Sequence, residues 1–328
     1  MKSKKLLWII PLGLVVLAVL AVAYYFLIGR RSNGIPFIKR EPIWSIGVYS
    51  GPSPIELSAP QSQVNPVVSA KDVTDVDAEF VADPFIVKEG NTWYLFFEVL
   101  DDHTKKGSIG VATSSDTKTW TYQQIVLQEP FHLSYPYVFK WEGQYYMVPE
   151  SSEDQSVRLY RAVDFPTKWV FEKKLLDGDY VDSAVFYYGE KWWLLTASAE
   201  WMKGDMLLFY SDQLTGPWQA HPLNPIIKGN ESISRLGGRV IEYQGKLIRY
   251  TQDSFPYYGR QILAFEIDEL TPTTYVEKQL SESSVVAGSG KGWNADGMHQ
   301  VDAYQIGDQQ WIAVVDGFRW KYSFGLGY

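Results

Sequence analysis

Acidic side chains recur at one position of a repeated phrase in this chain, and positioned carboxyl groups are common acid–base catalysts. Asp83 opens an apolar run, a turn follows at Gly90, and Glu98 closes the aromatic run after the turn. Tyr135 and Glu150 are separated along the chain by the same interval as Asp83 and Glu98. Because two short strands and a tight turn return the chain to its starting level, we expect each pair to lie side by side.

Later copies of the phrase place further polar residues at the position of Asp83. Asp182 takes this position in the third copy, Gly237 approximately in the fourth, and Asp302 in the fifth. We therefore predict that three carboxylates and one tyrosine face one mouth of a central channel, with the two glutamates beside them. Glycoside hydrolysis needs such a cluster, because one carboxyl group protonates the leaving oxygen while another activates water. An aspartate at a strand start also has a purely structural use, because it caps exposed backbone N–H groups.

Other polar residues gather near the same phrases and are candidate substrate-binding groups. His132 lies shortly before Tyr135, and His299 is the histidine of this chain best placed to act at the site. Arg235 and Arg239 open the fourth copy, where they would bind a carboxylate or phosphate of a substrate or pair with the acidic ring. No spacing resembles a tight metal site, so we expect no cofactor; a calcium ion in the channel is an alternative that the sequence does not support.

The repeat itself predicts the elements that carry these residues. Each copy is an apolar strand, a turn rich in Gly, and an aromatic strand, which together predict a hairpin. A second phrase follows the first four hairpins and supplies outer strands, giving about four strands per unit of roughly 50 residues, the pattern of a β-propeller. The hairpins cover residues 81–98, 134–150, 181–196, 237–250 and 301–315.

The fifth hairpin lies near the C-terminus and lacks its outer strands, and the missing phrase stands at the other end of the chain. Residues 44–50 resemble residues 107–114, and residues 54–57 would form the outermost strand. We expect these N-terminal strands to complete the last blade and close the ring, which removes open sheet edges. The prediction is one all-β domain over residues 44–328, a five-bladed β-propeller.

Composition narrows the possible partners. Of the 328 residues, 16% are aromatic, which favours strands and also suits stacking on sugar rings. The net charge of −8, with no basic run after the N-terminal segment, argues against nucleic acid as a partner. The absence of cysteine excludes disulfides, thiolate metal sites, a cysteine nucleophile and a lipoprotein anchor.

The N-terminus has the pattern of a membrane segment. Three lysines precede an uncharged apolar stretch over residues 6–28, which is long enough to cross a bilayer. The rival interpretation is a signal peptide cleaved after residues 21–23, which would make the protein secreted. We expect residues 1–28 to be an uncleaved single-pass anchor, residues 29–43 to be a linker, and the propeller to lie outside the cytoplasm.

Several phrases resemble a known group of proteins. Residues 82–85, residues 134–137 with 148–150, and residues 216–218 resemble the five-bladed propellers of arabinanase and β-xylosidase type glycoside hydrolases, of family 43. They resemble more closely the propeller at the N-terminus of glucosamine inositolphosphorylceramide transferases and its stand-alone bacterial relatives. The resemblance covers nearly all of residues 44–328.

The resemblance to the hydrolases implies roles for some of these carboxylates. Asp83 matches their general base and Asp182 matches the aspartate that tunes pKa values. Their general acid, a glutamate in a Glu-Gly-Pro phrase, has no match here, because Arg235 and the three residues after it occupy that place. Glu150 or Glu98 would then have to serve as the acid.

Two classes of function follow. The first is an extracytoplasmic, carbohydrate-active enzyme of glycosidase type that acts on a glycan or glycoconjugate at the channel mouth. The second is a non-catalytic protein, either a glycan-binding module that has lost the acid or a scaffold of the cell envelope. For the glycosidase and for the glycan-binding module alike, the expected substrate-binding residues are Tyr135, His132, Arg235, Arg239, His299 and Asp302.

Overall fold

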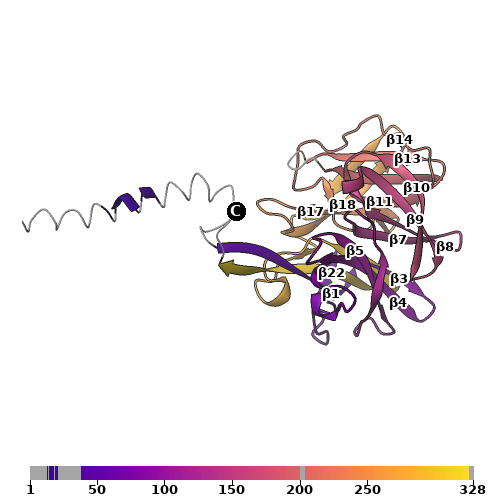
Figure 1. The fold of residues 1–328 in the computed structure, drawn as a ribbon. Helices are drawn as coiled ribbons and strands as arrows, with labels where there is room; N and C mark the ends of the chain where they lie inside the picture. Colours follow the sequence, from indigo (N-terminus) through magenta and orange to yellow (C-terminus); the bar gives the residue numbers. More distant parts are fainter. Residues whose placement is uncertain (1–12, 14, 18, 21–37, 200–203, 325–328) are drawn as a thin grey trace, which may run out of the picture. The chain divides into compact units, whose positions relative to one another are not determined.

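The computed structural model describes residues 13, 15–17, 19–20, 38–199 and 204–324. The chain forms two compact units, one comprising residues 1–43 and 320–328 and the other comprising Trp44–Arg319. The second unit is all-β and contains five antiparallel sheets (Figure 1). The prediction of a five-bladed propeller is confirmed.

The first three blades are consecutive in the chain. Each is a four-stranded sheet whose first strand lies at the centre of the ring and whose last strand lies outside in the order of the sheet. Their strands are β3 (Ala78–Glu89), β4 (Thr92–Asp101), β5 (Gly107–Ser114) and β6 (Thr121–Leu127), then β7 (Ser134–Trp141), β8 (Gln144–Glu150), β9 (Ser156–Asp164) and β10 (Lys168–Asp177), then β11 (Tyr180–Tyr188), β12 (Lys191–Ser198), β13 (Met206–Ser211) and β14 (Gln219–Ala220).

The fourth blade is less regular than the others. Its innermost part is broken into two short strands that both pair with β17, which accounts for the weak repeat in this region. Its strands are β15 (Arg235–Leu236), β16 (Ile241–Tyr243), β17 (Lys246–Asp253), β18 (Gln261–Leu270), β19 (Tyr275–Gln279) and β20 (Val286–Ala287).

The fifth blade joins the two ends of the chain. Its sheet has the order β2-β1-β22-β21, in which β21 (Val301–Gly307) and β22 (Gln310–Phe324) form the inner hairpin. The outer strands are β1 (Ile38–Ser53) and β2 (Glu56–Ser58), so the predicted closure by N-terminal strands is confirmed. β1 begins at Ile38, inside the segment that we expected to be a linker.

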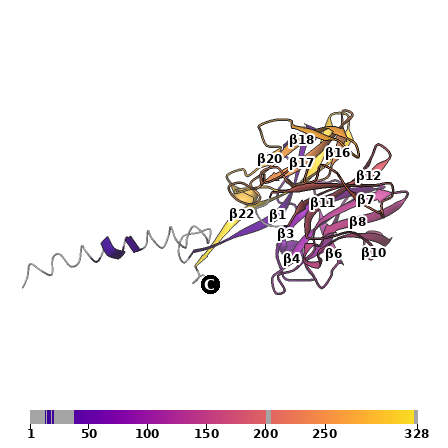
Figure 2. The same ribbon diagram turned by 90° about the horizontal axis from the view of Figure 1, so that it is seen from above.

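The innermost strands form a ring around the channel. Neighbouring contacts run from β21 to β3, to β7, to β11 and to β15, and a parallel bridge from Gly238 to Val301 returns to β21. Figure 2 shows β3, β7 and β11 of this ring from above. The polar residues of the repeated phrase lie on these strands, so the ring decides which of them can meet.

Sequence accounts for both the hairpins and the core between the blades. Turns such as Glu142-Gly143 and Gln244-Gly245 place both central residues at positive φ, which matches the twist of a two-residue hairpin. Strands such as β12 read as continuous apolar runs because both sheet faces are covered by neighbouring blades, and Trp193 is 2% exposed.

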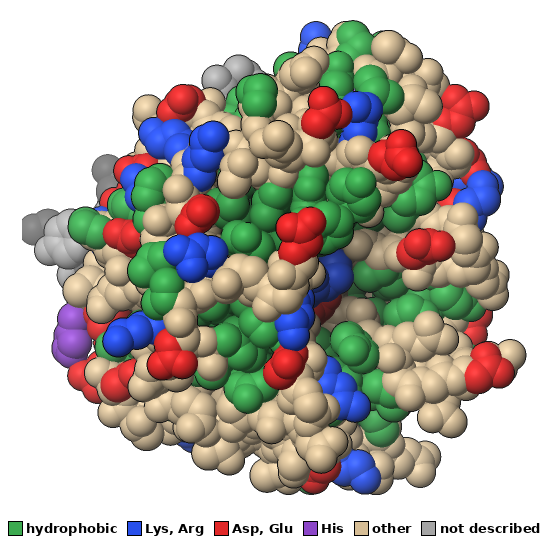
Figure 3. All heavy atoms as spheres, turned by 90° about the vertical axis from the view of Figure 1, so that its right-hand side faces the viewer, with side chains coloured by type: hydrophobic (Ala, Val, Ile, Leu, Met, Phe, Trp, Pro, Cys, Tyr) green, Lys and Arg blue, Asp and Glu red, His purple; other side chains and the backbone are tan. Residues whose placement is uncertain are grey.

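Some aromatic residues near the hairpin turns remain on the surface, with Tyr187 44% exposed and Tyr304 38% exposed. Figure 3 views the molecule from the side on which β8 is labelled in Figure 1 and shows hydrophobic side chains gathered around a hollow. The high aromatic content therefore serves both the packing between blades and the surface.

No helix in the part of the chain that the structure describes is long and apolar enough to cross a membrane. Most of the expected anchor over residues 6–28 lies outside the described residues.

Candidate active site

The same backbone irregularity occurs in the first three blades, at the predicted site positions. Asp83, Tyr135 and Asp182 have φ values of 53°, 44° and 51°, and each lies where the register of its hairpin shifts. A left-handed conformation at a residue other than Gly costs about 1–3 kcal/mol and persists only where its surroundings hold it. It therefore points to local contacts that fix these three side chains.

Hydrogen bonds between blades hold the first two of these residues. The N–H of Asp83 donates to Asp316 Oδ2 at 3.0 Å, and the N–H of Tyr135 donates to Asp83 Oδ2 at 3.1 Å. Each irregularity thus turns a backbone N–H toward the carboxylate of the preceding blade. The innermost strands are consequently joined by their side chains as well as by packing.

Asp316 is a central residue of the site, and the sequence analysis missed it. It is fully buried and accepts hydrogen bonds from the N–H groups of Asp83, His299 and Gln300, the last at 2.9 Å. The repeat could have revealed it, because Asp316 lies near the end of its inner hairpin, as Glu98 and Glu150 do in theirs.

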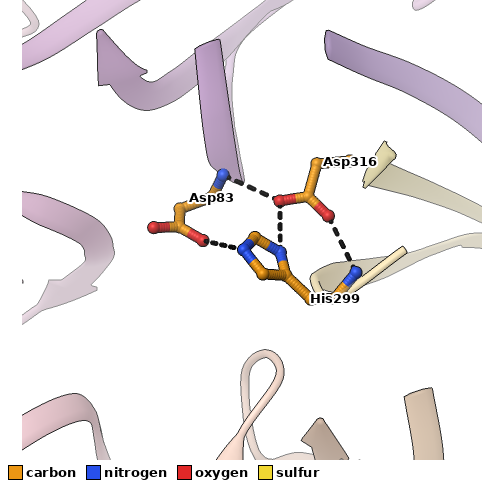
Figure 4. Close-up of side chains that lie close together, drawn as sticks. All are labelled: Asp83, His299 and Asp316. Carbon is orange, nitrogen blue, oxygen red and sulfur yellow. Dashed lines mark hydrogen bonds and ion pairs between the residues drawn. The ribbon is translucent and has the colours of Figure 1, made fainter. Parts of the chain in front are cut away.

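His299 lies between two aspartates (Figure 4). Its Nδ1 is 2.7 Å from Asp316 Oδ2, and its Nε2 is 3.8 Å from Asp83 Oδ1. Burial alone would lower the pKa of His299, but Asp316, followed by Asp83, reverses this, and the net pKa is raised. The ring is also stacked on Trp44, with centroids 3.9 Å apart, so its orientation is fixed.

The same three residues have the donor atoms of a metal site, since one ligand atom of each lies within 4.8 Å of the others. However, the oxygens of Asp316 already accept three backbone hydrogen bonds and face the imidazole. A metal ion would have to displace these contacts, so the set fits a buried cluster of ion pairs better than a metal centre.

A pocket of about 200 Å³, which we call the mouth pocket, opens beside this cluster of Asp83, His299 and Asp316. It brings together residues from several blades, including most of those that the sequence predicted for the site. Its carboxyl groups are those of Asp83, Glu98 and Glu150, its basic residues are His132, Arg235 and His299, and its aromatic walls are Trp44, Phe80 and Tyr258.

Glu98 lies in the pocket against a histidine whose tautomer can be assigned. The N–H of Gly107 donates to His132 Nδ1 at 2.9 Å, so the proton of the neutral ring is on Nε2, which lies 3.4 Å from Glu98 Oε1. Burial lowers the pKa of His132, which favours this neutral form. Burial, together with the charges of Asp83 and Glu150, holds the pKa of Glu98 well above its usual range.

The closeness of Glu98 and His132 depends on a glycine. A Cβ atom at Gly107 would lie 2.2 Å from the carbonyl oxygen of Leu133 and 2.9 Å from both Glu98 Oε1 and His132 Cε1. Only glycine fits there without displacing backbone or the acid itself.

The pKa of Asp83 is shifted in the same direction. Burial raises its pKa to about 7, and the charges of Asp182 and Asp316 add to this, whereas His299 and Arg235 oppose it. Burial therefore favours the protonated form of both carboxyl groups, and a raised pKa suits a carboxyl group that acts as a general acid.

Arg235 ties the remaining two carboxylates of the cluster together. Its Nε donates to Asp182 Oδ2, which also accepts a hydrogen bond from Gln252 Nε2 at 2.9 Å. Its second contact is with Glu150 Oε2 at 3.8 Å. Burial, and then Asp182, raise the pKa of Glu150 well above its usual range, against the opposing effect of Arg235.

Tyr135, Arg239 and Asp302 lie further along the channel and not in the mouth pocket. The Tyr135 hydroxyl donates to the carbonyl of Gly238 at 3.0 Å and accepts from its N–H at 3.1 Å. Arg239 binds both oxygens of Asp302, at 2.8 and 3.1 Å, and donates to the carbonyl of Val138. These side chains bridge the innermost strands and fill the channel.

The position of Asp302 differs from our expectation for a physical reason. The β21–β22 hairpin has no register shift near Asp302, which stays paired with Val314. Its carboxylate accepts the N–H of Ile86 at 2.7 Å, three residues beyond Asp83 along β3. In the fifth blade, Asp316 and His299 therefore contact Asp83, while Asp302 lies deeper.

Comparison with known proteins agrees with this architecture. The family model described as "Glucosamine inositolphosphorylceramide transferase 1, N-terminal" matches residues 38–318. Glucosamine inositolphosphorylceramide transferase 1 of Oryza sativa subsp. japonica is 38% identical over 300 residues, and that of Arabidopsis thaliana is 37% identical. Both alignments cover 85% of this chain but only 40% and 39% of the relatives, so the chain matches less than half of their length.

Solved structures share the fold at low sequence identity. Beta-1,2-mannobiose phosphorylase from Listeria innocua superposes with a TM-score of 0.57 and 14% identity, over 83% of this chain and 97% of that one. A putative glycoside hydrolase from Parabacteroides distasonis gives 0.57 and 12%, over 79% and 95%. The family model and the relatives together identify the chain as a member of the family formed by the N-terminal region of glucosamine inositolphosphorylceramide transferase 1.

Proposed function

We propose that the mouth pocket is the active site of a carbohydrate-active enzyme resembling glycoside hydrolases, with Asp83 as general base and Glu98 as general acid. The observation that carries the proposal is that these two carboxyl groups line one pocket and both have raised pKa values. Glu98 is the better acid than Glu150, because no arginine contacts it among the described residues, whereas Arg235 contacts Glu150.

The protonation states follow from the surroundings of each group. The raised pKa of Glu98 favours its protonated form, which donates the proton to the leaving oxygen of a glycosidic bond. Asp83, with its pKa of about 7, accepts a proton from the attacking nucleophile. Asp182 acts indirectly, since its charge raises the pKa values of Asp83, Glu98 and Glu150. The charge of His299 limits how far the pKa of Asp83 rises.

The proposed ligand is a single sugar unit of a glycan or glycoconjugate. The pocket, at about 200 Å³, is smaller than the roughly 300–1,000 Å³ typical of drug-sized ligands. Tyr258 offers aromatic surface beside the carboxyl groups. Supporting arguments are that the relatives are named as transferases of glucosamine inositolphosphorylceramide and that one structural neighbour was solved with beta-1,2-mannobiose.

A panel of aryl glycosides and a glycan array, applied to the same protein, tests this proposal. Asp83→Asn and Glu98→Gln should each lower the rate on any hydrolysed glycoside by about 10²- to 10⁴-fold. Binding of the same sugar should change little, because each variant removes a proton-transfer group and almost no volume. Hydrolysis that is unaffected by both substitutions would contradict the assignment.

A second candidate is a glycan-binding module without catalysis, and the position of Arg235 favours it. This arginine stands where the related hydrolases carry their acid, and it pairs with Asp182 and contacts Glu150. In this case the array detects a ligand, no glycoside is hydrolysed, and Asp83→Asn alters affinity only slightly.

We also propose that residues 6–28 anchor the protein in a membrane, with the propeller outside the cytoplasm. The support is the uncharged apolar stretch that follows Lys2, Lys4 and Lys5.

A further inference from the structure

Basic and aromatic side chains are concentrated where β1 and β22 belong to the smaller unit. We call residues 39–43 of β1 and 320–323 of β22 the terminal ribbon; the two strands are neighbours in their sheet. The ribbon carries three cations, Lys39, Arg40 and Lys321, against one anion, Glu41. The chain as a whole has a net charge of −8, so the local sign is reversed.

The side chains of the ribbon are arranged on two faces. The guanidinium of Arg40 lies 4.0 Å from the centre of the Trp320 ring. Because side chains alternate along a strand, Tyr322 shares the face of Trp320, while Lys321 points to the other face. Tyr322 is 64% exposed and the Lys39 side chain is 66% exposed. The ribbon thus presents an aromatic face with one cation, and a second face on which Lys321 accompanies Lys39 and its ion-pair partner Glu41.

We propose that the terminal ribbon binds the surface of a membrane that contains anionic lipids. Trp and Tyr are enriched at membrane–water interfaces, where the ring is buried among headgroups and its polar edge stays hydrated. Lysine and arginine are attracted to anionic headgroups over a distance of about one Debye length. The ribbon also follows the apolar stretch in the sequence, so it combines these residue types with a second membrane-directed segment.

The sequence limits how far the ribbon can be from a bilayer. The apolar stretch ends at Ile28, and Lys39 opens the ribbon a short distance later. A fully extended chain covers at most roughly 3.6 Å per residue, so the tether between these two residues reaches no more than about 40 Å. If residues 6–28 enter the bilayer, the ribbon is held near the surface at high effective concentration.

The absence of cysteine allows a direct test with the full chain. Ser323→Cys, at the end of the ribbon, creates a single labelling site for an environment-sensitive fluorophore. The label should be protected from iodide quenching in vesicles of phosphatidylcholine mixed with phosphatidylglycerol. It should stay accessible in vesicles of phosphatidylcholine alone and become accessible again at high salt, where the Debye length falls to about 3 Å.

Removing the lysines should reverse the protection. Each cation near an anionic surface is expected to contribute about five-fold, so Lys39→Gln with Lys321→Gln should lower the ratio of protected to exposed label about 25-fold. Lys118→Gln with Lys173→Gln, which removes the same charge from exposed positions of the propeller, is the matched control and should have little effect. A label at Ser115→Cys, on the propeller, reports any general burial of the protein.

Equal quenching of the Ser323→Cys label in both kinds of vesicle would overturn the proposal. It would also be overturned if the control pair abolished the protection as fully as the ribbon pair. Because the readout is lipid contact of the ribbon, it is independent of whether the mouth pocket binds or cleaves a glycan.

Discussion

Asp83 has two tasks that place opposite demands on its charge. Its carboxylate holds the N–H of Tyr135, and in the proposed function it must accept a proton. Burial beside Asp182 and Asp316 makes the ionised form unfavourable, whereas His299 compensates in part. The resulting pKa of about 7 should appear in the stability of the protein as well as in any activity.

The pH dependence of stability tests this value. An unfolded aspartate releases its proton near pH ~4, but folded Asp83 keeps it until about pH 7, so the unfolded state is the more ionised between these values. Stability therefore falls as the pH rises through this window. Urea unfolding at the two ends of the window should show that Asp83→Asn loses less stability than the wild type. Parallel pH profiles for the two proteins would mean that Asp83 is ionised throughout.

Gly107 provides a second test at this scale. Gly107→Ala should destabilise the protein by about 1–3 kcal/mol, because the added methyl group collides with the carbonyl of Leu133 and with Glu98. Gly90→Ala is the comparison, since a Cβ there meets no atom within 4 Å and only its positive φ is unfavourable. Thermal unfolding should rank Gly107→Ala as the more damaging; the reverse order would contradict the close packing around the proposed acid.

The sequence predicted most of the residues of the pocket, because equivalent positions of the repeat lie at the same height along the channel. The equal return from Asp83 to Glu98 and from Tyr135 to Glu150 correctly placed each pair at neighbouring positions of its hairpin, with Ala82 opposite Glu98 and Ser134 opposite Glu150. It could not reveal that the Tyr135 side chain reaches across the channel to Gly238, since a repeat does not specify where a side chain points.

At the scale of elements, the shifted register of β3, β7 and β11 separates the pocket from the filled channel. β21 has no register shift at the equivalent position. Asp302 therefore stays paired with its partner strand and lies away from the channel mouth. Period and turn residues predict strands well, but a register shift depends on tertiary contacts such as the one between Asp83 and Asp316.

The closure of the ring gives a prediction about β1 and β2. Deleting residues 44–58 should leave β22 without its neighbour and expose an unpaired edge. We expect the truncated protein to aggregate, which light scattering of the purified protein would detect. Hydrogen exchange of the intact protein should show amides of residues 46–50 protected as strongly as those of β22. A monomeric, folded truncated protein would contradict the structural role of these strands.

At the scale of the whole molecule, the sequence predicted the fold more completely than the function. The count of five blades and the use of both chain ends were visible in the repeat. Function was less accessible, because the sequence does not reveal that Arg235 pairs with Asp182 and contacts Glu150.

The anchoring of the protein is a further prediction at this scale. The mature protein isolated from membranes should retain residues 1–28, because the apolar stretch continues past the small residues at 21–23. N-terminal sequencing that begins at Tyr24 would show that the segment is a cleaved signal peptide. In that case the terminal ribbon would lack its tether.

The fifth blade also limits the order in which the blades can form during synthesis. β1 ends at Ser53 and leaves the ribosome early, but its partner β22 begins only at Gln310. At about 5–20 residues per second, the first strands wait roughly 13–50 seconds before the strand they must pair with has been made. During that interval the other four blades can form one after another, while the last joint of the ring stays open until β22 has been made. For the same time β1 and β2 present unpaired strand edges, which can pair with other chains.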